Sequence, residues 1–346
     1  MINNLMEENF ELVISYAGYS TVSLRINSNN INEFQTVKMH RRKQELKEVS
    51  ILAPDKDGWE HWGRKFIEYF IGTSDMALEC IIQNPEVLRF TYDKNTSQLS
   101  VYSNAPLTIN NKALGYIITY QLEDFMLDFK NNVVRYMGYT GFKNTETNSQ
   151  KRIRIWEKNR REAYDGSMTH FMRSLYSDSV FANGFIVHEK IRVYPEDSSF
   201  STLYSPINQP KFARLNDKIF LIKTGPVTGL KKEPAYVDLF DTTLFSFTKA
   251  TTFDKVKKQK TFYFENYLSL TYKNAFAKED YKRQNGIPGS IKMMQTSDIM
   301  LVTEDPIVID ANGMFYNPEN LLTTGYWGWD KMAGSLPSDY VYEKKE

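Results

Sequence analysis

Alternating hydrophobic and polar residues recur along most of the chain and predict antiparallel strands. Val22, Leu24 and Ile26 alternate behind an apolar run at 10–14, which predicts a hairpin about an Ala-Gly turn. Short turns such as Lys94–Ser97 join neighbouring strands in antiparallel pairs, because parallel pairing needs a long crossover. Asn312-Gly313 is a tight-turn signal. Further strands are expected at 87–93, 98–103, 114–122, 125–129, 133–139, 184–194, 218–224, 235–240, 244–248, 260–271, 290–303 and 306–310.

Two longer segments have helical periodicity. Asp57 is placed to cap a helix at 58–71, whose apolar stripe is formed by Trp59, Trp62, Phe66, Tyr69 and Phe70. A second helix is expected at 149–176, with Gly166 inside it. Its apolar face is predicted to pack on the sheet through Ile153, Trp156, Phe171 and Leu175.

These elements together predict an α+β protein, mostly antiparallel β-sheet with a few packing helices. We expect two domains, an N-terminal β unit at 1–50 and a β-rich body at 51–346, with a loop-rich segment at 195–259. The hairpin of the first unit is marginal alone and needs further strands to cover its apolar face.

Composition changes this picture little. The 43 basic and 42 acidic residues balance, so no overall field favours nucleic acid. The single cysteine, Cys80, excludes an internal disulfide and a multi-cysteine metal site, and its apolar neighbours favour a buried, inert thiol. No apolar run approaches the ~20 residues that span a bilayer. No signal peptide is visible, so the sequence taken literally indicates a cytoplasmic protein.

Ser167 and His170 are the candidate catalytic pair, because they lie three residues apart in the second helix and a hydrolase could use them as nucleophile and base. The sequence supplies no third group and no nucleophile elbow beside them. The preferred interpretation is that catalytic residues are absent and that these polar groups bond neighbouring backbone at the edge of an amphipathic helix.

Other ligand sites find little support. The four histidines, His40, His61, His170 and His188, lack zinc-ligand spacing, and we predict no metal and no cofactor. The glycines and lysines of 225–232 miss the P-loop spacing and are expected to form a surface turn. The basic run at 40–43 is interpreted as a solvated edge. Tyr326–Trp329 is interpreted as a short aromatic helix that plugs the sheet, rather than a platform for a sugar ring.

Several separated motifs resemble one group of proteins. They are Phe70–Ser74, Cys80, Asn84–Phe90, Leu114–Tyr116, Trp156–Arg160, Gly166–Leu175 and Gly325–Trp329. In these the chain is similar to the carboxypeptidase-like regulatory domain-containing proteins of Bacteroidota. The resemblance implies a transthyretin-like β-sandwich before the body, of which Ser15–Tyr19 would be an end, so the chain is expected to be an N-terminally truncated member. It also implies a periplasmic or cell-envelope location. The zinc motif of the metallocarboxypeptidases is missing, so no catalytic role is carried over.

The leading functional hypothesis is a non-enzymatic envelope protein that binds an unknown protein or glycan partner through sheet edges or loops. The alternative is a hydrolase that uses Ser167 and His170, and a third option is an inert fragment.

Overall fold

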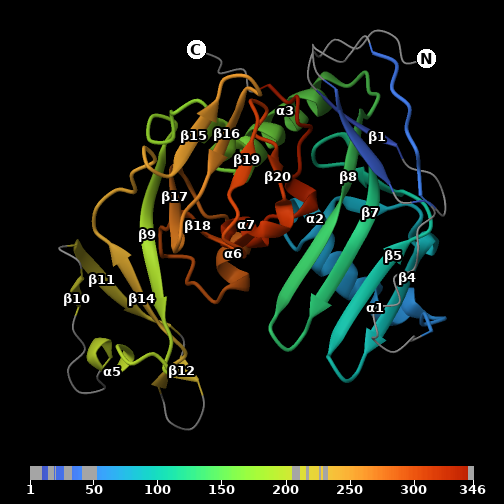
Figure 1. Ribbon diagram of the computed structural model, residues 1–346. Helices are drawn as coiled ribbons and strands as arrows, with labels where there is room; N and C mark the ends of the chain where they lie inside the picture. The colour runs from blue at the N-terminus through green and yellow to red at the C-terminus, as the bar shows by residue number, and fades with distance from the viewer. Residues whose placement is uncertain are drawn as a thin grey trace. The chain divides into compact units, whose positions relative to one another are not determined.

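The computed structural model describes residues 10–14, 19, 21–26, 33–40, 53–204, 211–215, 218–225, 227–228 and 233–341 (Figure 1). The chain forms two compact units, each built on its own antiparallel sheet. Unit 1 comprises Met1–Ile71 and Leu78–Ile153, and unit 2 comprises Gly72–Ala77 and Arg154–Glu346. The boundary expected at residue 50 falls within the first of these units and stays a prediction. Most of the basic run at 40–43 and of the turn at 225–232 lies outside the described residues.

Unit 1 contains an N-terminal hairpin and a six-stranded sheet. The hairpin pairs β1 (Phe10–Ile14) with β2 (Val22–Ile26), as predicted. The sheet has the order β3-β6-β7-β5-β4, and β8 pairs with β7. The predicted interruption after residue 122 is wrong, because β7 continues through an irregular register between Leu122 and Asp124. The sheet strands are β3 (Cys80–Ile82), β4 (Leu88–Asp93), β5 (Gln98–Ser103), β6 (Leu107–Asn111), β7 (Tyr116–Asp128) and β8 (Val133–Asn144).

The first predicted helix covers the core of this sheet. It consists of α1 (Gly58–Phe66) and a π-helical turn at Ile67–Ile71. Phe66 and Phe70 are fully buried, and the ring centroids of Phe66 and of Phe125 in β7 lie 4.9 Å apart. Asp57 occupies the N-cap position, but its side chain makes no capping hydrogen bond, contrary to the prediction. Cys80 is half-buried, and burial raises the pKa of its thiol to about 12, which favours an unreactive thiol.

A seven-stranded antiparallel sheet organises unit 2. Its order is β10-β11-β14-β9-β17-β18-β21. The strands are β9 (Phe185–Val193), β10 (Phe212–Leu215), β11 (Lys218–Thr224), β14 (Val237–Asp241), β17 (Tyr267–Phe276), β18 (Met294–Leu301) and β21 (Leu321–Gly325). A smaller four-stranded sheet contains β15 (Thr251–Asp254), β16 (Gln259–Phe262), β19 (Ile307–Ile309) and β20 (Phe315–Tyr316), and a two-stranded ladder pairs β12 (Val227–Thr228) with β13 (Glu233–Pro234).

The helix predicted at 149–176 is two helices, α3 (Gln150–Tyr164) and α4 (Met168–Tyr176). The single-helix prediction fails at Gly166, whose φ of 77° lies in the left-handed region that ends helices. Ser167 then has extended backbone and caps α4. Phe171 and Leu175 are buried against β9 and β17 in the main hydrophobic core, while Trp156 is buried and Ile153 half-buried.

Short helices complete the described structure. They are α2 (Asp75–Leu78), α5 (Phe200–Leu203), α6 (Glu279–Gln284), α7 (Tyr326–Trp329) and single 3₁₀ turns at Pro85–Val87, Pro318–Asn320 and Met332–Gly334. The strand predicted at 244–248 does not form. Its Phe245 and Phe247 instead pack on the main core from a loop that turns at Ala250, whose N–H donates to Phe247 O. No helix among the described residues is both long and apolar enough to cross a membrane.

Candidate functional site

The side chains of Ser167 and His170 both accept hydrogen bonds at the start of α4. The Ser167 Oγ accepts a hydrogen bond from the backbone N–H of His170 at 3.1 Å, as an N-cap side chain does. The His170 Nδ1 accepts from the backbone N–H of Gly166 at 3.2 Å. The imidazole ring stacks on Tyr164 and meets Tyr272 edge-on. These hydrogen bonds of the Ser167 Oγ and the His170 Nδ1 both go to backbone groups at the break between α3 and α4.

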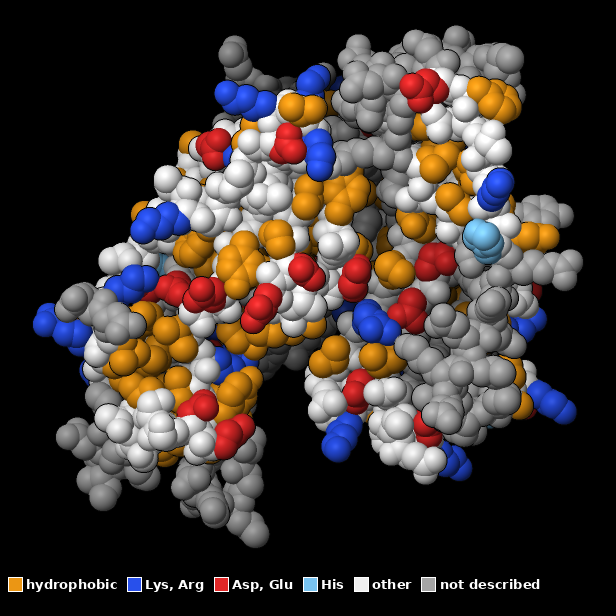
Figure 2. Space-filling model, in the orientation of Figure 1, with side chains coloured by type: hydrophobic (Ala, Val, Ile, Leu, Met, Phe, Trp, Pro, Cys, Tyr) orange, Lys and Arg blue, Asp and Glu red, His pale blue; other side chains and the backbone are white. Residues whose placement is uncertain are grey.

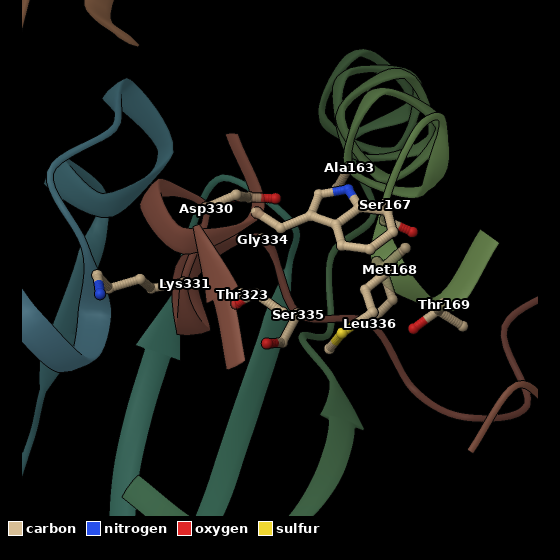
Figure 3. Close-up of a pocket in the computed structure, with 11 residues that line it drawn as sticks. Ala163, Ser167, Met168, Thr169, Thr323, Asp330, Lys331, Gly334, Ser335 and Leu336 are labelled. Carbon is tan, nitrogen blue, oxygen red and sulfur yellow. The ribbon is translucent and has the colours of Figure 1, made fainter. Parts of the chain in front are cut away.

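Ser167 also lines a cavity of about 160 Å³ (Figure 3). The side chains of Met168 and Thr169 continue the same wall, and Asp330 lies on the opposite side. Thr323, Trp327, Lys331, Ser335 and Leu336 complete most of the lining. His170 is not part of it, so the cavity does not unite the two candidate catalytic residues.

Asp330 has the most perturbed carboxyl group of this region. Burial raises its pKa from 3.8 to about 6, while Lys278 lowers the pKa and Asp280 raises it further. A carboxyl whose pKa is raised in the folded state stabilises that state most below the unfolded pKa, and this contribution is lost as the pH rises through about 6.

Replacing Asp330 with asparagine is therefore expected to stabilise the protein at neutral pH. The variant keeps a neutral side chain, so its advantage should be small at pH 4 and reach about 1–2 kcal/mol at pH 7. Guanidinium denaturation of both proteins at the two pH values measures the difference. Asp339→Asn, at an exposed carboxyl, is the control. An equal effect of Asp330→Asn at both pH values would contradict the assignment.

A second candidate site lies on one face of the seven-stranded sheet. Arg192 and Lys190 of β9 stand opposite Asp238 and Phe240 of β14, and Lys190 also stands opposite Tyr267 of β17. Residues directly opposite one another in an antiparallel pair project from the same face. The intervening residues, such as Val187 and Val193, enter the hydrophobic clusters on the other face. We call this set of residues the tyrosine–arginine face. It contains Lys190, Arg192, Asp238, Phe240 and Tyr267, with the adjoining Tyr194, Tyr236 and Asp298.

Charge pairs form the centre of this face. Arg192 binds Asp238 through two parallel hydrogen bonds of 2.7 and 2.8 Å. Lys190 as a whole is 1% exposed. Its Nζ lies 2.5 Å from Asp298 Oδ2 and 3.6 Å from Asp238 Oδ2. Burial lowers the pKa of the Arg192 guanidinium, but the hydrogen bonds to Asp238 outweigh it and leave that pKa raised. Two cations and two carboxylates thus give a network with no net charge.

Tyrosine rings surround the charge pairs. The Arg192 guanidinium lies 3.6 Å from the Tyr236 ring centroid and 5.1 Å from that of Tyr267, which places it in cation–π contact with both rings. Tyr194 approaches Tyr236 edge-on, with centroids 6.5 Å apart, and is 41% exposed. The face therefore offers aromatic surface and fixed hydrogen-bonding groups side by side.

Sequence reasoning missed this face, although its signal was present. The strand at 184–194 was predicted, and its alternate residues His188, Lys190, Arg192 and Tyr194 are all polar or amphipathic. A period of two places such residues on one face. The acidic and aromatic partners come from β14, β17 and β18, which are distant in sequence, so no local motif links them.

Two further histidines considered as ligands from the sequence contact other groups of the protein. His61 pairs with Asp55 at 2.8 Å, and His188 Nδ1 lies 2.9 Å from Thr243 O. No group of histidine, cysteine and acidic residues in the described parts of the chain is arranged to hold a metal ion. The aromatic helix packs as predicted, since Tyr326 is buried against Tyr281 of α6, and the indole N–H of Trp327 donates to Gly166 O at 2.7 Å.

Comparison with known proteins adds no identification. No family model, no curated protein and no solved structure matches this chain. The resemblance to the carboxypeptidase-like regulatory domain-containing proteins stays a prediction.

Proposed function

We propose that this chain is a non-enzymatic binding protein and that its ligand is a glycan held on the tyrosine–arginine face. One observation carries the proposal, namely the gathering of Tyr194, Tyr236 and Tyr267 around the paired guanidinium of Arg192. Aromatic rings present flat apolar surface that suits the C–H faces of sugar rings. Carboxylates and guanidinium groups beside them can bond sugar hydroxyls.

The neutral charge network favours a neutral, hydroxyl-rich ligand. Lys190, Arg192, Asp238 and Asp298 compensate one another, and the exposed Lys223, which stands opposite Asp238 with its Nζ 4.5 Å from the Phe240 ring centroid, adds one positive charge. The face therefore carries little net charge and does not select a strongly charged partner. Their positions are fixed by mutual hydrogen bonds, which keeps the cost of ordering them on binding low.

A protein partner fits the centre of this face less well, because charged residues are depleted at the cores of protein interfaces. The far end of the sheet is more apolar, since Phe212 is 58% exposed and Ile219 44% exposed. Figure 2 shows hydrophobic side chains gathered over β11 and β14. A protein ligand would be expected to bind at that end. The cell-envelope location belongs to the same proposal and is supported only by the sequence resemblance.

Replacing Tyr194 with alanine is expected to weaken glycan binding at least tenfold, or about 1.4 kcal/mol, because an exposed ring of the face is removed. The measurement is affinity electrophoresis against a panel of neutral polysaccharides, followed by calorimetry with matching oligosaccharides. Tyr263→Ala is the matched control, because Tyr263 is 37% exposed and follows β16 of the other sheet. No binding by the wild-type chain, or equal losses in both variants, would refute the proposal.

A hydrolase remains the second candidate, and the position of Ser167 in the cavity wall favours it. A screen of peptides, esters and glycosides with wild type, Ser167→Ala and His170→Ala tests it. Hydrolysis abolished by either substitution in a folded variant would favour the enzyme. Hydrolysis that neither substitution changes, or no hydrolysis, would remove it.

A further inference from the structure

The cavity beside Trp327 has walls of opposite electrical character. Its first wall is the start of α4, where Ser167, Met168 and Thr169 line the space. Within α4 the described hydrogen bonds use the N–H groups of His170 and Phe171, which donate to Ser167. The N–H groups of the first helical turn point away from the helix and favour an anion. The opposite wall contains the carboxyl group of Asp330 (Figure 3).

A smaller adjoining cavity reinforces the negative end. It has a volume of about 10 Å³ and shares Ala163, Ser167, Trp327 and Asp330 with the larger one. This is room for about one water-sized group. Glu162, Asp165 and Asp330 line it together with a single cation, Lys278, so that acidic groups predominate.

Gln295 supplies an independent indication of a ligand. It is 7% exposed and lines the smaller cavity, and its Oε1 has no hydrogen-bond partner in the described structure. A buried acceptor without a donor costs about 1–3 kcal/mol. A ligand N–H group in the smaller cavity would satisfy this oxygen.

Apolar and polar side chains together line the space between the two ends. Trp327, Met168, Leu336 and Ala163 line the larger cavity, which at about 160 Å³ exceeds what one polar group needs. Threonine and serine hydroxyls, from Thr169, Thr323 and Ser335, lie among them. A bound molecule would therefore combine an apolar body with two oppositely charged ends.

We propose that these adjoining cavities bind a free α-amino acid with an apolar side chain. Its carboxylate faces the first turn of α4 and the Ser167 hydroxyl. Its ammonium group faces Asp330 and the Gln295 Oε1, beside the Trp327 ring. The apolar side chain packs against Met168 and Leu336. This site is separate from the tyrosine–arginine face, so the inference goes beyond the proposed glycan binding and does not depend on it.

Calorimetry on the full chain with L-leucine and L-phenylalanine tests the site. Each amino acid is compared with its N-acetyl derivative, which lacks the ammonium group, and with its amide, which lacks the carboxylate. We expect at least one amino acid to bind and both derivatives to bind at least tenfold more weakly. Equal binding of the three forms, or binding of neutral monosaccharides in place of the amino acids, would overturn the proposal, as would no binding at all.

Two substitutions locate the ligand. Asp330→Asn should weaken binding of the amino acid at least tenfold and leave binding of its N-acetyl derivative unchanged, because only the ammonium contact is lost. Asp339→Asn should change neither, and Tyr194→Ala should keep amino-acid binding, which separates this site from the glycan proposal. Asp330→Asn that binds the amino acid as wild type does, while its denaturation midpoint confirms a folded protein, would refute the placement.

Discussion

Replacing Lys190 with methionine is expected to lower the free energy of unfolding by about 3 kcal/mol, because removing one partner of a buried ion pair leaves the other unpaired. Lys190 is 1% exposed, and its Nζ lies 2.5 Å from Asp298 Oδ2. Methionine fills most of the volume of the lysine stem but offers no donor, so Asp298 loses this partner. Asp238 keeps both bonds to Arg192.

Guanidinium denaturation measures this loss, and hydrogen exchange at the amides of β9 and β17 locates it. Lys65→Met is the control. Lys65 pairs with Glu68 at 2.9 Å, but the two side chains are 45% and 38% exposed, so a loss of about 1 kcal/mol or less is expected. Adding Asp298→Asn to Lys190→Met should restore part of the stability. A Lys190→Met protein no less stable than Lys65→Met would show that the buried pair contributes little.

Replacing Gly166 with alanine is the second change with a large expected effect. Gly166 has a φ of 77°, and a Cβ there would lie 2.4 Å from Gln295 Oε1 and 2.7 Å from Tyr272 Cδ1. Left-handed backbone costs a residue with a Cβ about 1–2 kcal/mol. The clash with buried neighbours adds about 1–3 kcal/mol. We expect a total loss of about 3 kcal/mol in the free energy of unfolding.

Gly286→Ala separates these two contributions. Gly286 has a φ of 65°, and a Cβ there would meet nothing within 4 Å. Only the backbone cost of about 1–2 kcal/mol is then expected. Chemical denaturation of the two variants gives the difference directly. Equal losses would show that the Gln295 and Tyr272 side chains move aside without cost.

Most of the β-structure could be predicted because its signal is local. The strands β4, β5 and β11 lie at or within one residue of their predicted bounds, since alternation, β-branched and aromatic residues and turn signals all occur within each segment. The Asn312-Gly313 turn also forms, and Gly313 has a φ of 75°. The wrong prediction at 244–248 occurred where a distant contact outweighed local preference. Phe245 and Phe247 have strand-like spacing, but the main core holds them in a loop.

The helix predicted at 149–176 shows both what local periodicity predicts correctly and where it fails. Trp156 in its first half and Phe171 and Leu175 in its second are buried as predicted, at 7%, 0% and 1% exposure, whereas Ile153 is only half-buried. One periodicity does not continue through Gly166, however, because a single left-handed residue redirects the chain and Ser167 begins a new helix. At the same break, the Ser167 Oγ accepts a hydrogen bond from the backbone N–H of His170 and not from its imidazole.

By itself, the sequence determined the α+β class, the antiparallel pairing and the absence of any recognisable local catalytic motif, because periodicity and turn chemistry act over a few residues. Only the tertiary structure decided which residues meet. It joined Lys190 and Arg192 of β9 to acids on β14 and β18, and it placed Asp330 across a cavity from Ser167. The residues of these pairs lie 46 to 163 positions apart, and their meeting depends on strand order and register, which no local pattern specifies.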